Sequence, residues 1–284
     1  MTTVWINGTW RDRESATISV FDHGLLYGDG VFEGIRVYGG KIFRLAEHLD
    51  RLYDSAKATW LTIPMPKDEL ARLHEEAVRR SGLAEAYIRT IITRGVGDLG
   101  LDPRKCATPS VIIIVDTIAL WPRDRYERGL VVVTAGTPVP HRESLSPRVK
   151  SLNYLPHILA KVEGINAGAD EVLMLDAGGW VAEGSGSNLF VVRRGELTTP
   201  RTTDGILRGV TRDAVIELAR EAGYPVHEAP LNRFDVYTAD EVFFTGTAAE
   251  LVHARQVDGR MIGDGSTGPV TRDLEARFQR LARG

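Results

Sequence analysis

Hydrophobic residues recur along the first half of the chain with two periods, which separate predicted strands from predicted helices. Two stretches rich in β-branched residues and bounded by turn residues, "AYIRTIITR" and "SVIIIVDTI", predict strong strands. Helical spacing predicts two helices before them, at about residues 46–59 and 67–81. Shorter strands are predicted nearer the start, in "TVWING", "TISV", "VFEGIRVY" and "KIFRL". This half therefore predicts a small lobe of strands and helices.

The second half follows a proline- and charge-rich segment that breaks both periods, "ALWPRDRYERG". We therefore expect a small N-terminal lobe at 1–119, an interdomain linker at 120–129 and a larger C-terminal lobe at 130–284. The larger lobe contains predicted strands in "LVVVTAG", "DEVLML", "SNLFVV" and "DEVFFTG", and predicted helices from about Gly209 and from about Thr271. Together the two halves predict an α/β (α+β) fold class.

The composition narrows the classes of partner. The 284 residues are 43% hydrophobic and carry a net charge of only −3, with no single-sign block and no basic aromatic patch, so we expect no nucleic-acid partner. No apolar run approaches the roughly 18 residues of a membrane span, and "MTTVWINGTW" lacks the features of a signal peptide. A single cysteine fits a reducing compartment, so a cytoplasmic location is predicted. No cysteine/histidine cluster has zinc spacing, and no metal is expected.

Two sequence features suggest other chemistry, but the residues around them argue against it. The segment "GVGDLG" at 95–100 matches the G-x-G-x-x-G pattern and follows a strand, but it runs into the turn-forming "LDPRKCATP" instead of opening a helix. We therefore reject a Rossmann domain and expect these glycines to shape a loop near a pocket, or an ordinary turn. Cys106 lies in the same polar loop with no adjacent base, so a cysteine nucleophile is not expected.

Lys150 stands in a stretch that predicts the start of a helix, "RVKSLNYLPHILAK". Asn153 can cap this helix, and Pro156 falls in its first turn, where a missing N–H breaks no intrahelical bond. Apolar residues then follow with helical spacing: Leu155, Ile158, Leu159, Val162 and Ile165. Lys150 is therefore expected in an extended segment just before the helix, among apolar neighbours.

A lysine in an apolar setting raises the question of nucleophilic chemistry. The commonest nucleophilic use of lysine is a Schiff base with a carbonyl compound or with pyridoxal phosphate, and the alternative is a surface lysine whose stem covers apolar neighbours. A pyridoxal site also needs an acid beside the pyridine nitrogen. Glu183, in "GWVAEGSGSNLFVV", lies at a predicted turn where glycine and serine let the backbone approach a flat ligand. A solvated turn glutamate is the alternative.

Two segments can bind the phosphate of such a cofactor through backbone N–H groups. The first, "ILRGVTRDAVIELAREAG", has a glycine-led helix start with Val210 and Thr211 in its first turn. The second, "FFTGTAAE", makes a turn after a predicted buried strand and offers hydroxyls and amides at residues 245–248. Their joint presence with Lys150 and Glu183 favours a cofactor site.

These motifs, in this order and spacing, resemble the fold-type IV pyridoxal-phosphate enzymes. The segments that carry the resemblance are "VKSLNYL", "EGSGSN", "GVTRDAVIELA" and "ADEVFFTGTAAE". The segments "YGDGVFEGIRVY", "YIR" and "RGVGDLGLDPRKC" are most similar to the branched-chain aminotransferases. The match runs from about Trp5 to Arg272, nearly the whole chain.

The resemblance implies cofactor roles residue by residue. It makes Lys150 the Schiff-base lysine and the general acid/base, and Glu183 the partner of the pyridine nitrogen. Tyr154 would form a hydrogen bond with the ring hydroxyl oxygen. The residues implied to hold the phosphate are Arg51, Val210, Thr211 and Thr247.

The resemblance also implies a set of substrate-binding residues: Phe32, Gly34, Arg36, Tyr87, Arg89, Thr247 and Ala248. Tyr87 and the amides of Thr247 and Ala248 would lie near the substrate α-carboxylate. Tyr87, Arg89 and Thr93 alternate with Ile88, Thr90 and Ile92, so one face of their strand can be polar while the other is buried. The alternative is an edge strand with a solvated face. Arg36 and Arg89 could pair with the second carboxylate of glutamate.

The implied activity is pyridoxal 5′-phosphate-dependent transamination of L-leucine, L-isoleucine and L-valine with 2-oxoglutarate, in a ping-pong cycle through an internal aldimine on Lys150. The implied architecture is a small N-terminal α/β lobe and a larger C-terminal pseudo-barrel lobe, with the cofactor between them. In this family loops of a neighbouring subunit close the site, so a homo-oligomer, at least a dimer, is expected. The small-molecule partners would be amino acids and 2-oxo acids.

Departures from the family pattern leave alternatives open. Pro156 and Arg208 replace residues that are usual there, and "LVHARQVDGR" lacks the proline that usually follows the threonine–alanine turn. A D-amino-acid or (R)-amine transaminase and an aminodeoxychorismate lyase share the cofactor and the fold. A non-catalytic module that binds a phosphate ligand is the alternative from another class.

Overall fold

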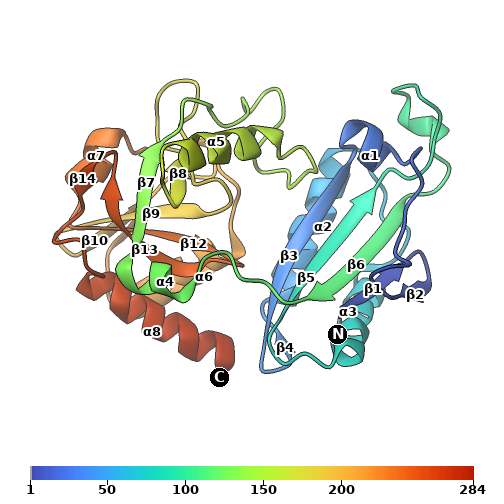
Figure 1. Ribbon diagram of the computed structural model, residues 1–284, viewed down its shortest axis with the longest axis horizontal. Helices are drawn as coiled ribbons and strands as arrows, with labels where there is room; N and C mark the ends of the chain where they lie inside the picture. The colour runs from blue at the N-terminus through green and yellow to red at the C-terminus, as the bar shows by residue number, and fades with distance from the viewer. Residues whose placement is uncertain (1) are drawn as a thin grey trace. The chain divides into compact units, whose positions relative to one another are not determined.

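The chain forms two compact units, and each is described by itself. The computed structural model describes residues 2–284. The first unit runs to Ile118 and includes Val149–Asn153, and the second comprises Ala119–Arg148 and Tyr154–Gly284 (Figure 1). The predicted linker contains a short helix, α4 (Arg123–Arg128). No helix in residues 2–284 has both the length and the apolar character needed to cross a bilayer.

The first unit is built on one antiparallel sheet with strand order β2-β1-β6-β5-β3-β4. Its strands are β1 (Thr3–Ile6), β2 (Thr9–Arg11), β3 (Gly30–Tyr38), β4 (Lys41–Ile42), β5 (Ala86–Thr93) and β6 (Ser110–Asp116). Its helices are α1 (His23–Tyr27), α2 (Leu45–Ala58), α3 (Lys67–Ser81) and the single 3₁₀ turn η1 (Pro103–Lys105). The helices predicted at 46–59 and 67–81 are confirmed as α2 and α3. The strand predicted in "TISV" is wrong, because residues 17–20 have no regular structure.

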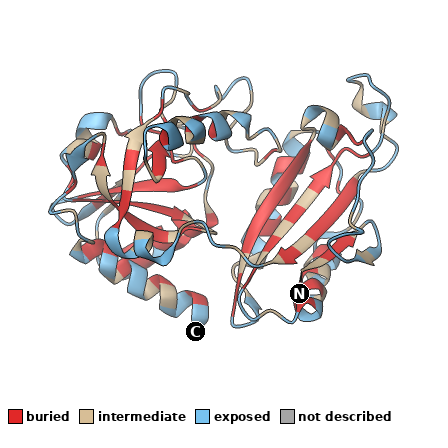
Figure 2. Cartoon of the chain, in the orientation of Figure 1, coloured by how far each residue is buried: buried red, intermediate tan, exposed pale blue. Residues whose placement is uncertain are grey.

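Helices α2 and α3 pack on the sheet and bury its apolar residues (Figure 1). Leu52 of α2 and Leu70 of α3 are fully buried there, with Ile35 of β3 and Ile88 of β5. Strand β5 lies inside the sheet, between β6 and β3, so the edge-strand alternative is wrong. Its residues alternate between buried and half-buried, as a strand with one covered face requires (Figure 2).

The second unit contains a mixed sheet with strand order β11-β10-β9-β12-β13-β7-β8, and β14 pairs with β13. Its strands are β7 (Leu130–Thr134), β8 (Glu171–Leu173), β9 (Asn188–Arg193), β10 (Glu196–Thr199), β11 (Val226–Glu228), β12 (Glu241–Gly246), β13 (Glu250–Val257) and β14 (Arg260–Met261). Its longer helices are α5 (Leu155–Asn166), α6 (Val210–Glu221) and α8 (Pro269–Arg283), beside the short α4 and α7 (Arg233–Tyr237). The pairs β10–β11, β13–β7 and β7–β8 are parallel.

Helices α6 and α8 contact each other and β12, and α5 contacts β7 and β8. A buried glutamate of β12 fixes the start of α8: Glu241 accepts hydrogen bonds from the amides of Val270 and Thr271, at 3.0 and 2.8 Å. A carboxylate in this position satisfies amides that have no partner within the helix and complements the helix dipole. Sequence patterning did not predict β13, whose polar His253 and Arg255 and whose bulge near residue 255 interrupt the alternation.

Helix α5 differs from its sequence prediction in two ways. Its cap is Tyr154, whereas Asn153 donates from Nδ2 to the Gly28 carbonyl oxygen at 3.0 Å, so the prediction of an Asn153 cap is wrong. The predicted apolar stripe is not the buried face of the helix. The buried face consists of His157, Ala160 and Gly164, and the stripe residues are 45–63% exposed: Leu155, Ile158, Leu159, Val162 and Ile165. The position of Pro156 in the first turn is confirmed.

A buried histidine joins α3 to β5 in the first unit. His74 Nδ1 lies 2.7 Å from the Leu70 carbonyl oxygen, and Nε2 lies 2.6 Å from Thr90 Oγ1. Because a carbonyl only accepts, Nδ1 carries the proton and Nε2 accepts from the threonine hydroxyl. Burial lowers the pKa of His74 to about 4. The folded chain therefore holds this ring neutral at pH values where the unfolded chain protonates it.

The neutral His74 should make the first unit sensitive to acid. Its folded pKa lies below the ordinary value of about 6.5, so its stabilising effect is complete above that value and is lost as the pH falls toward 4. Linkage gives a loss of about 2 kcal/mol in unfolding free energy between pH 7.5 and pH 5. Buried His48, whose pKa is also lowered by burial, adds in the same direction. In His74→Gln this loss of unfolding free energy with falling pH should be absent, which urea unfolding at pH 7.5 and at pH 5 would measure.

Leu52→Ala is the matched control, because it opens a cavity in the same core without removing a titratable group. It should lower the unfolding free energy by about 2–5 kcal/mol equally at both pH values. If the unfolding free energy of His74→Gln falls between pH 7.5 and pH 5 by as much as that of the wild type, His74 is not the source of the acid sensitivity.

Candidate active site

The backbone around Lys150 is fixed against β3 in the first unit. The amide of Phe32 donates to the Lys150 carbonyl oxygen, and the amide of Leu152 donates to the Gly30 carbonyl oxygen, both at 2.9 Å. Ser151 forms an antiparallel bridge with Val31 between these bonds. The segment 149–153 thus pairs with the first half of β3 at Ser151. The Ser151 amide also donates to the Val149 carbonyl oxygen at 2.9 Å, so the chain makes a tight turn at Lys150, where an extended segment was predicted.

Helix α2 and the Phe32 ring hold Lys150 from other directions. The Lys150 amide donates to Ser55 Oγ at 3.1 Å, and the ammonium nitrogen lies 4.6 Å from the centroid of the Phe32 ring. The side chain is half-buried. A lysine held at its backbone by two elements and flanked by an aromatic face presents its amine from a defined position.

Glu33 carries a carboxylate with no exposed surface, and Arg51 pairs with it in a fork. Arg51 Nε lies 2.6 Å from Oε1 and Nη2 lies 2.8 Å from Oε2, while His48 Nδ1 lies 2.8 Å from Oε2. Burial alone would raise the pKa of Glu33, but the charge of Arg51 and the hydrogen bond from His48 outweigh it and hold the pKa well below its usual range. Burial lowers the pKa of His48, so the neutral ring donates from Nδ1. The fork fixes the Arg51 guanidinium in place and orientation.

The predicted substrate residues of the first unit lie on the sheet face opposite to Glu33. Strand alternation puts Phe32, Gly34 and Arg36 on one face of β3, and register places Gly34 opposite Arg89 and Arg36 opposite Tyr87. The Arg89 guanidinium carbon lies 4.5 Å from the Phe32 ring centroid and 5.5 Å from that of Tyr87. The structure therefore brings this set together.

Gly34 has a steric reason to be glycine. A Cβ placed there would lie 1.8 Å from the Tyr87 hydroxyl oxygen, so the tyrosine hydroxyl occupies the space above this residue. Burial raises the pKa of Tyr87, which keeps it a hydrogen-bond donor near neutral pH. Arg36 lies at the other end of the set, 4.0 Å from Glu85 and with its guanidinium 5.2 Å from the Tyr38 ring.

In the second unit, Glu183 has one carboxylate oxygen that is fully engaged. Oε2 accepts from Asn188 Nδ2 and from the Leu207 amide, both at 3.1 Å. Oε1 faces His157 Nε2 at 3.7 Å, which is longer than a hydrogen bond. The carboxylate is 7% exposed. It is therefore a positioned anion, not the solvated turn glutamate of the alternative interpretation.

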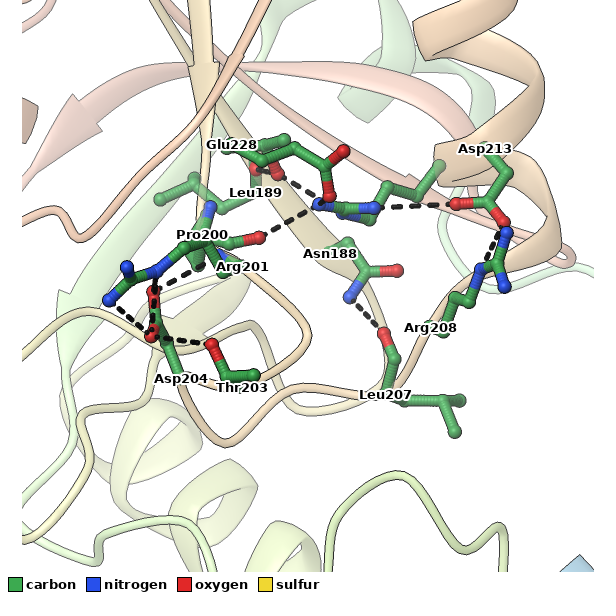
Figure 3. A network of polar contacts seen from close by, with 12 residues as sticks. Asn188, Leu189, Pro200, Arg201, Thr203, Asp204, Leu207, Arg208, Asp213 and Glu228 are labelled. Carbon is green, nitrogen blue, oxygen red and sulfur yellow. Dashed lines mark hydrogen bonds and ion pairs between the residues drawn. The ribbon is translucent and has the colours of Figure 1, made fainter.

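The start of α6 is linked to Glu183 through Asn188. Asn188 Nδ2 also donates to the Leu207 carbonyl oxygen at 2.9 Å, which orients the loop that leads into the helix (Figure 3). A Cβ at the cap residue, Gly209, would lie 2.1 Å from Asn188 Oδ1, so only glycine fits there. No side chain caps α6, and the predicted phosphate residues Val210 and Thr211 are buried in its first turn.

A buried arginine anchors this helix start to the sheet. Arg212 is 1% exposed, and its Nη2 donates to the Pro200 carbonyl oxygen at 2.9 Å and to Glu228 at 2.8 Å. Arg208, which departs from the family pattern, pairs with Asp213 at 2.7 Å on the exposed side (Figure 3). The first turn of α6 is thus held without a side-chain cap.

The turn that contains Thr247 and Ala248 follows β12, close to Asn188. Thr245 and Asn188 are direct partners on β12 and β9, and Gly246 lies against Gly186 and Ser187. In the part of the chain that the structure describes, the buried hydroxyls of Ser187 and Thr245 have no hydrogen-bond partner. Two unpaired buried hydroxyls near a turn rich in amides suit a polar ligand group.

The remaining sequence predictions concern Tyr154, the loop at 95–100, Cys106 and metal binding. Tyr154 caps α5 and stacks on His157, with ring centroids 4.7 Å apart. Residues 95–100 form a loop and open no helix, which confirms the rejection of a Rossmann domain. Burial raises the pKa of Cys106, which argues against a nucleophilic thiolate. Among residues 2–284 no group of three or more His, Cys, Asp or Glu side chains could hold a metal ion.

Sequence reasoning missed three residues that hold the predicted ones. Glu33 and Asn188 are part of the segments that carried the resemblance, and their polar side chains between apolar strand residues were a usable signal. His157 gave no such signal, because its place on the buried face of α5 runs against the apolar periodicity.

The comparisons with known proteins agree over nearly the whole chain. Residues 30–257 match the family described as amino-transferase class IV. A protein of Methanocaldococcus jannaschii is 49% identical over 276 residues, which is 97% of this chain and 95% of that protein. The crystal structure of the Escherichia coli branched-chain amino acid aminotransferase has a TM-score of 0.96 and 37% identity, covering 99% of this chain and 95% of that one.

A second solved structure adds a bound ligand. This branched-chain amino acid aminotransferase from T.th., complexed with N-(5′-phosphopyridoxyl)-L-glutamate, has a TM-score of 0.93 and 38% identity, over 99% of this chain and 94% of that one. These matches extend over the segments that contain Lys150, Glu183 and the start of α6. The chain belongs to the class IV aminotransferases.

Proposed function

We propose that this protein is a pyridoxal 5′-phosphate-dependent branched-chain aminotransferase, which moves the amino group of L-leucine, L-isoleucine or L-valine to 2-oxoglutarate. The observation that carries the proposal is the Glu183 carboxylate, buried and held through Oε2 alone. A buried anion with one oxygen available is what a protonated pyridine nitrogen needs as a partner. The solved relatives named above, which are branched-chain aminotransferases, support the substrate class.

The cofactor fits the residues present. When bound, pyridoxal phosphate supplies an aldehyde that condenses with amines and a ring that accepts electrons from the substrate Cα–H bond. We assign Lys150 as the residue that carries the cofactor, and its amine as the group that takes the proton from Cα and returns it. Tyr154 would donate to the ring hydroxyl oxygen.

We assign the phosphate to backbone amides and one guanidinium. Val210 and Thr211 begin a helix that no side chain caps, and their amides favour an anion. Thr247 adds an amide and a hydroxyl from the turn after β12. In the first unit Glu33 holds Arg51 through Nε and Nη2, which orients the guanidinium that we assign to the phosphate.

For the substrate we assign Tyr87, with the amides of Thr247 and Ala248, to the α-carboxylate. Phe32 would provide an apolar wall for a branched side chain. Arg36 or Arg89 would pair with the distal carboxylate of glutamate, which an aliphatic side chain lacks. A cytoplasmic location stays a prediction of the composition.

Addition of L-leucine to the holoenzyme should convert the absorbance of bound pyridoxal phosphate to that of the amine form, and 2-oxoglutarate should reverse the change. D-Alanine and (R)-1-phenylethylamine should leave the spectrum unchanged. A response to either of them but not to L-leucine would favour the D-amino-acid or (R)-amine alternative. A colourless protein that stays colourless with added cofactor would contradict the proposal.

Lysine variants give the matched control for this experiment. Lys150→Ala should lose the cofactor band and essentially all turnover. Lys161→Ala should keep both, because Lys161 Nζ lies 2.7 Å from the Asp170 carbonyl oxygen and 3.6 Å from Glu171. Borohydride reduction followed by peptide mapping should label Lys150, and a label on Lys161 would overturn the assignment.

Arg89→Ala should raise the apparent KM for 2-oxoglutarate much more than it affects the half-reaction with L-leucine. Loss of a charge-assisted contact typically costs about 1.5–3 kcal/mol, or roughly ten- to a hundred-and-fifty-fold in affinity. Arg36→Ala is the comparison, because Arg36 lies on the same sheet face. Equal losses in both half-reactions of Arg89→Ala would place Arg89 at the shared α-carboxylate, and Arg36 would become the distal contact.

We also propose that the protein is a homo-oligomer that covers the exposed stripe of α5. Five aliphatic side chains in one contiguous row are more than a soluble surface usually exposes in one place. The wild type should elute in light-scattering chromatography at twice the monomer mass or more, and Ile158→Glu should lower this mass or make it depend on concentration. Leu281→Glu, at an exposed leucine of α8, is the control. An unchanged mass for Ile158→Glu would exclude the stripe from the interface.

A further inference from the structure

We propose that His157 is a positioning residue of the cofactor site, which holds the Glu183 carboxylate and the Tyr154 ring in a fixed relation. This inference rests on the proposed function. Pyridoxal phosphate carries its ring nitrogen and its ring hydroxyl on either side of one carbon. Since Glu183 is assigned to the nitrogen and Tyr154 to the hydroxyl, a side chain that contacts both residues can set their positions relative to each other.

The geometry of His157 joins the two assigned residues directly. Its ring stacks on Tyr154 with centroids 4.7 Å apart and planes 25° apart. Its Nε2 lies 3.7 Å from Glu183 Oε1, the oxygen that Asn188 and Leu207 leave unbonded. At 3.7 Å the imidazole attracts the carboxylate without using a lone pair of Oε1, which stays able to accept from a pyridine nitrogen.

The chemistry of His157 argues against a space-filling role. The side chain is buried, and its Nδ1 has no hydrogen-bond partner within the described residues. An unpaired buried nitrogen reduces stability, so an apolar residue would fill the same space at lower cost. The charged group that faces the ring is Glu183, at 3.7 Å from Nε2.

The position of His157 in α5 explains how it stays in place. It lies on the buried face with Ala160 and Gly164, which lets the helix approach β7 and β8 closely. A Cβ at Gly164 would lie 2.6 Å from Val172, so the helix cannot move outward without losing a close contact. The imidazole is therefore carried by a helix that is fixed against the sheet.

The test uses titration of the apoprotein with pyridoxal phosphate and visible circular dichroism of the bound cofactor. His157→Phe keeps a ring that can stack on Tyr154 but removes the nitrogen beside Glu183. It should weaken cofactor binding by about ten-fold, a size typical of neighbours in one polar network, and reduce the dichroism per bound cofactor. His253→Asn, at a buried histidine of β13 that bonds Thr267, is the control and should change neither quantity.

A double-mutant cycle decides whether His157 acts through Glu183. In Glu183→Gln the carboxylate charge is absent, so adding His157→Phe should cost less than about two-fold. An equal ten-fold loss in both backgrounds would overturn the route through Glu183. Unchanged affinity and unchanged dichroism in His157→Phe would overturn the inference as a whole.

A second variant covers the case in which His157→Phe does not fold. His157→Gln keeps a polar group near Glu183 and loses the ring, so it should reduce the dichroism while changing affinity less than about three-fold. Unchanged dichroism in this variant would overturn the role of the ring in holding Tyr154. A wild type that binds no pyridoxal phosphate would instead contradict the proposed function, which keeps the two failures distinguishable.

Discussion

The first unit depends on one ionised carboxylate that has no contact with water. An unpaired charge in a protein core costs several kcal/mol, so Glu33 is stable only with its two partners from α2 in place. Because Glu33 belongs to β3 and its partners belong to the helix, the ion pair fixes α2 on the covered face of the sheet. Phe32 and Gly34, its neighbours in β3, then necessarily face the other way. Residues that hold the core and residues proposed to contact the substrate therefore alternate along a single stretch of chain.

The second unit uses a carboxylate in a different manner. Glu183 is held by hydrogen bonds to an amide and to an asparagine, without a cation in a fork, and one of its oxygens remains unbonded. Such an arrangement keeps the group in place but leaves its charge only partly compensated. The two glutamates thus differ in their partners: both oxygens of Glu33 are bonded, whereas one oxygen of Glu183 is left for the ligand role that we propose for it.

Lys150 and Glu183 could be singled out from the sequence because ionisable side chains are uncommon among apolar neighbours, and their roles, implied by the family resemblance, stay predictions. The buried face of α5 could not be predicted, because periodicity reports which positions are apolar and not what will cover them. The prediction that Asn153 caps α5 was wrong because its side-chain amide instead donates to the carbonyl oxygen of Gly28, more than a hundred residues away. Local propensity does not reveal such a partner. The role of Glu33 also needed the tertiary structure, which brings α2 against β3.

The pairing of residues 149–153 with β3 has a consequence for synthesis. The first unit otherwise ends at Ile118, so about 30 further residues must be translated before its last sheet segment exists. At about 5–20 residues per second this takes roughly 2–6 s. During that interval the amide of Phe32 and the carbonyl of Gly30 lie on an unpaired strand edge, which invites contact with other nascent chains. The residue proposed to carry the cofactor thus lies in the segment that closes this edge, and the same five residues that present the amine also end the period of exposure on the ribosome.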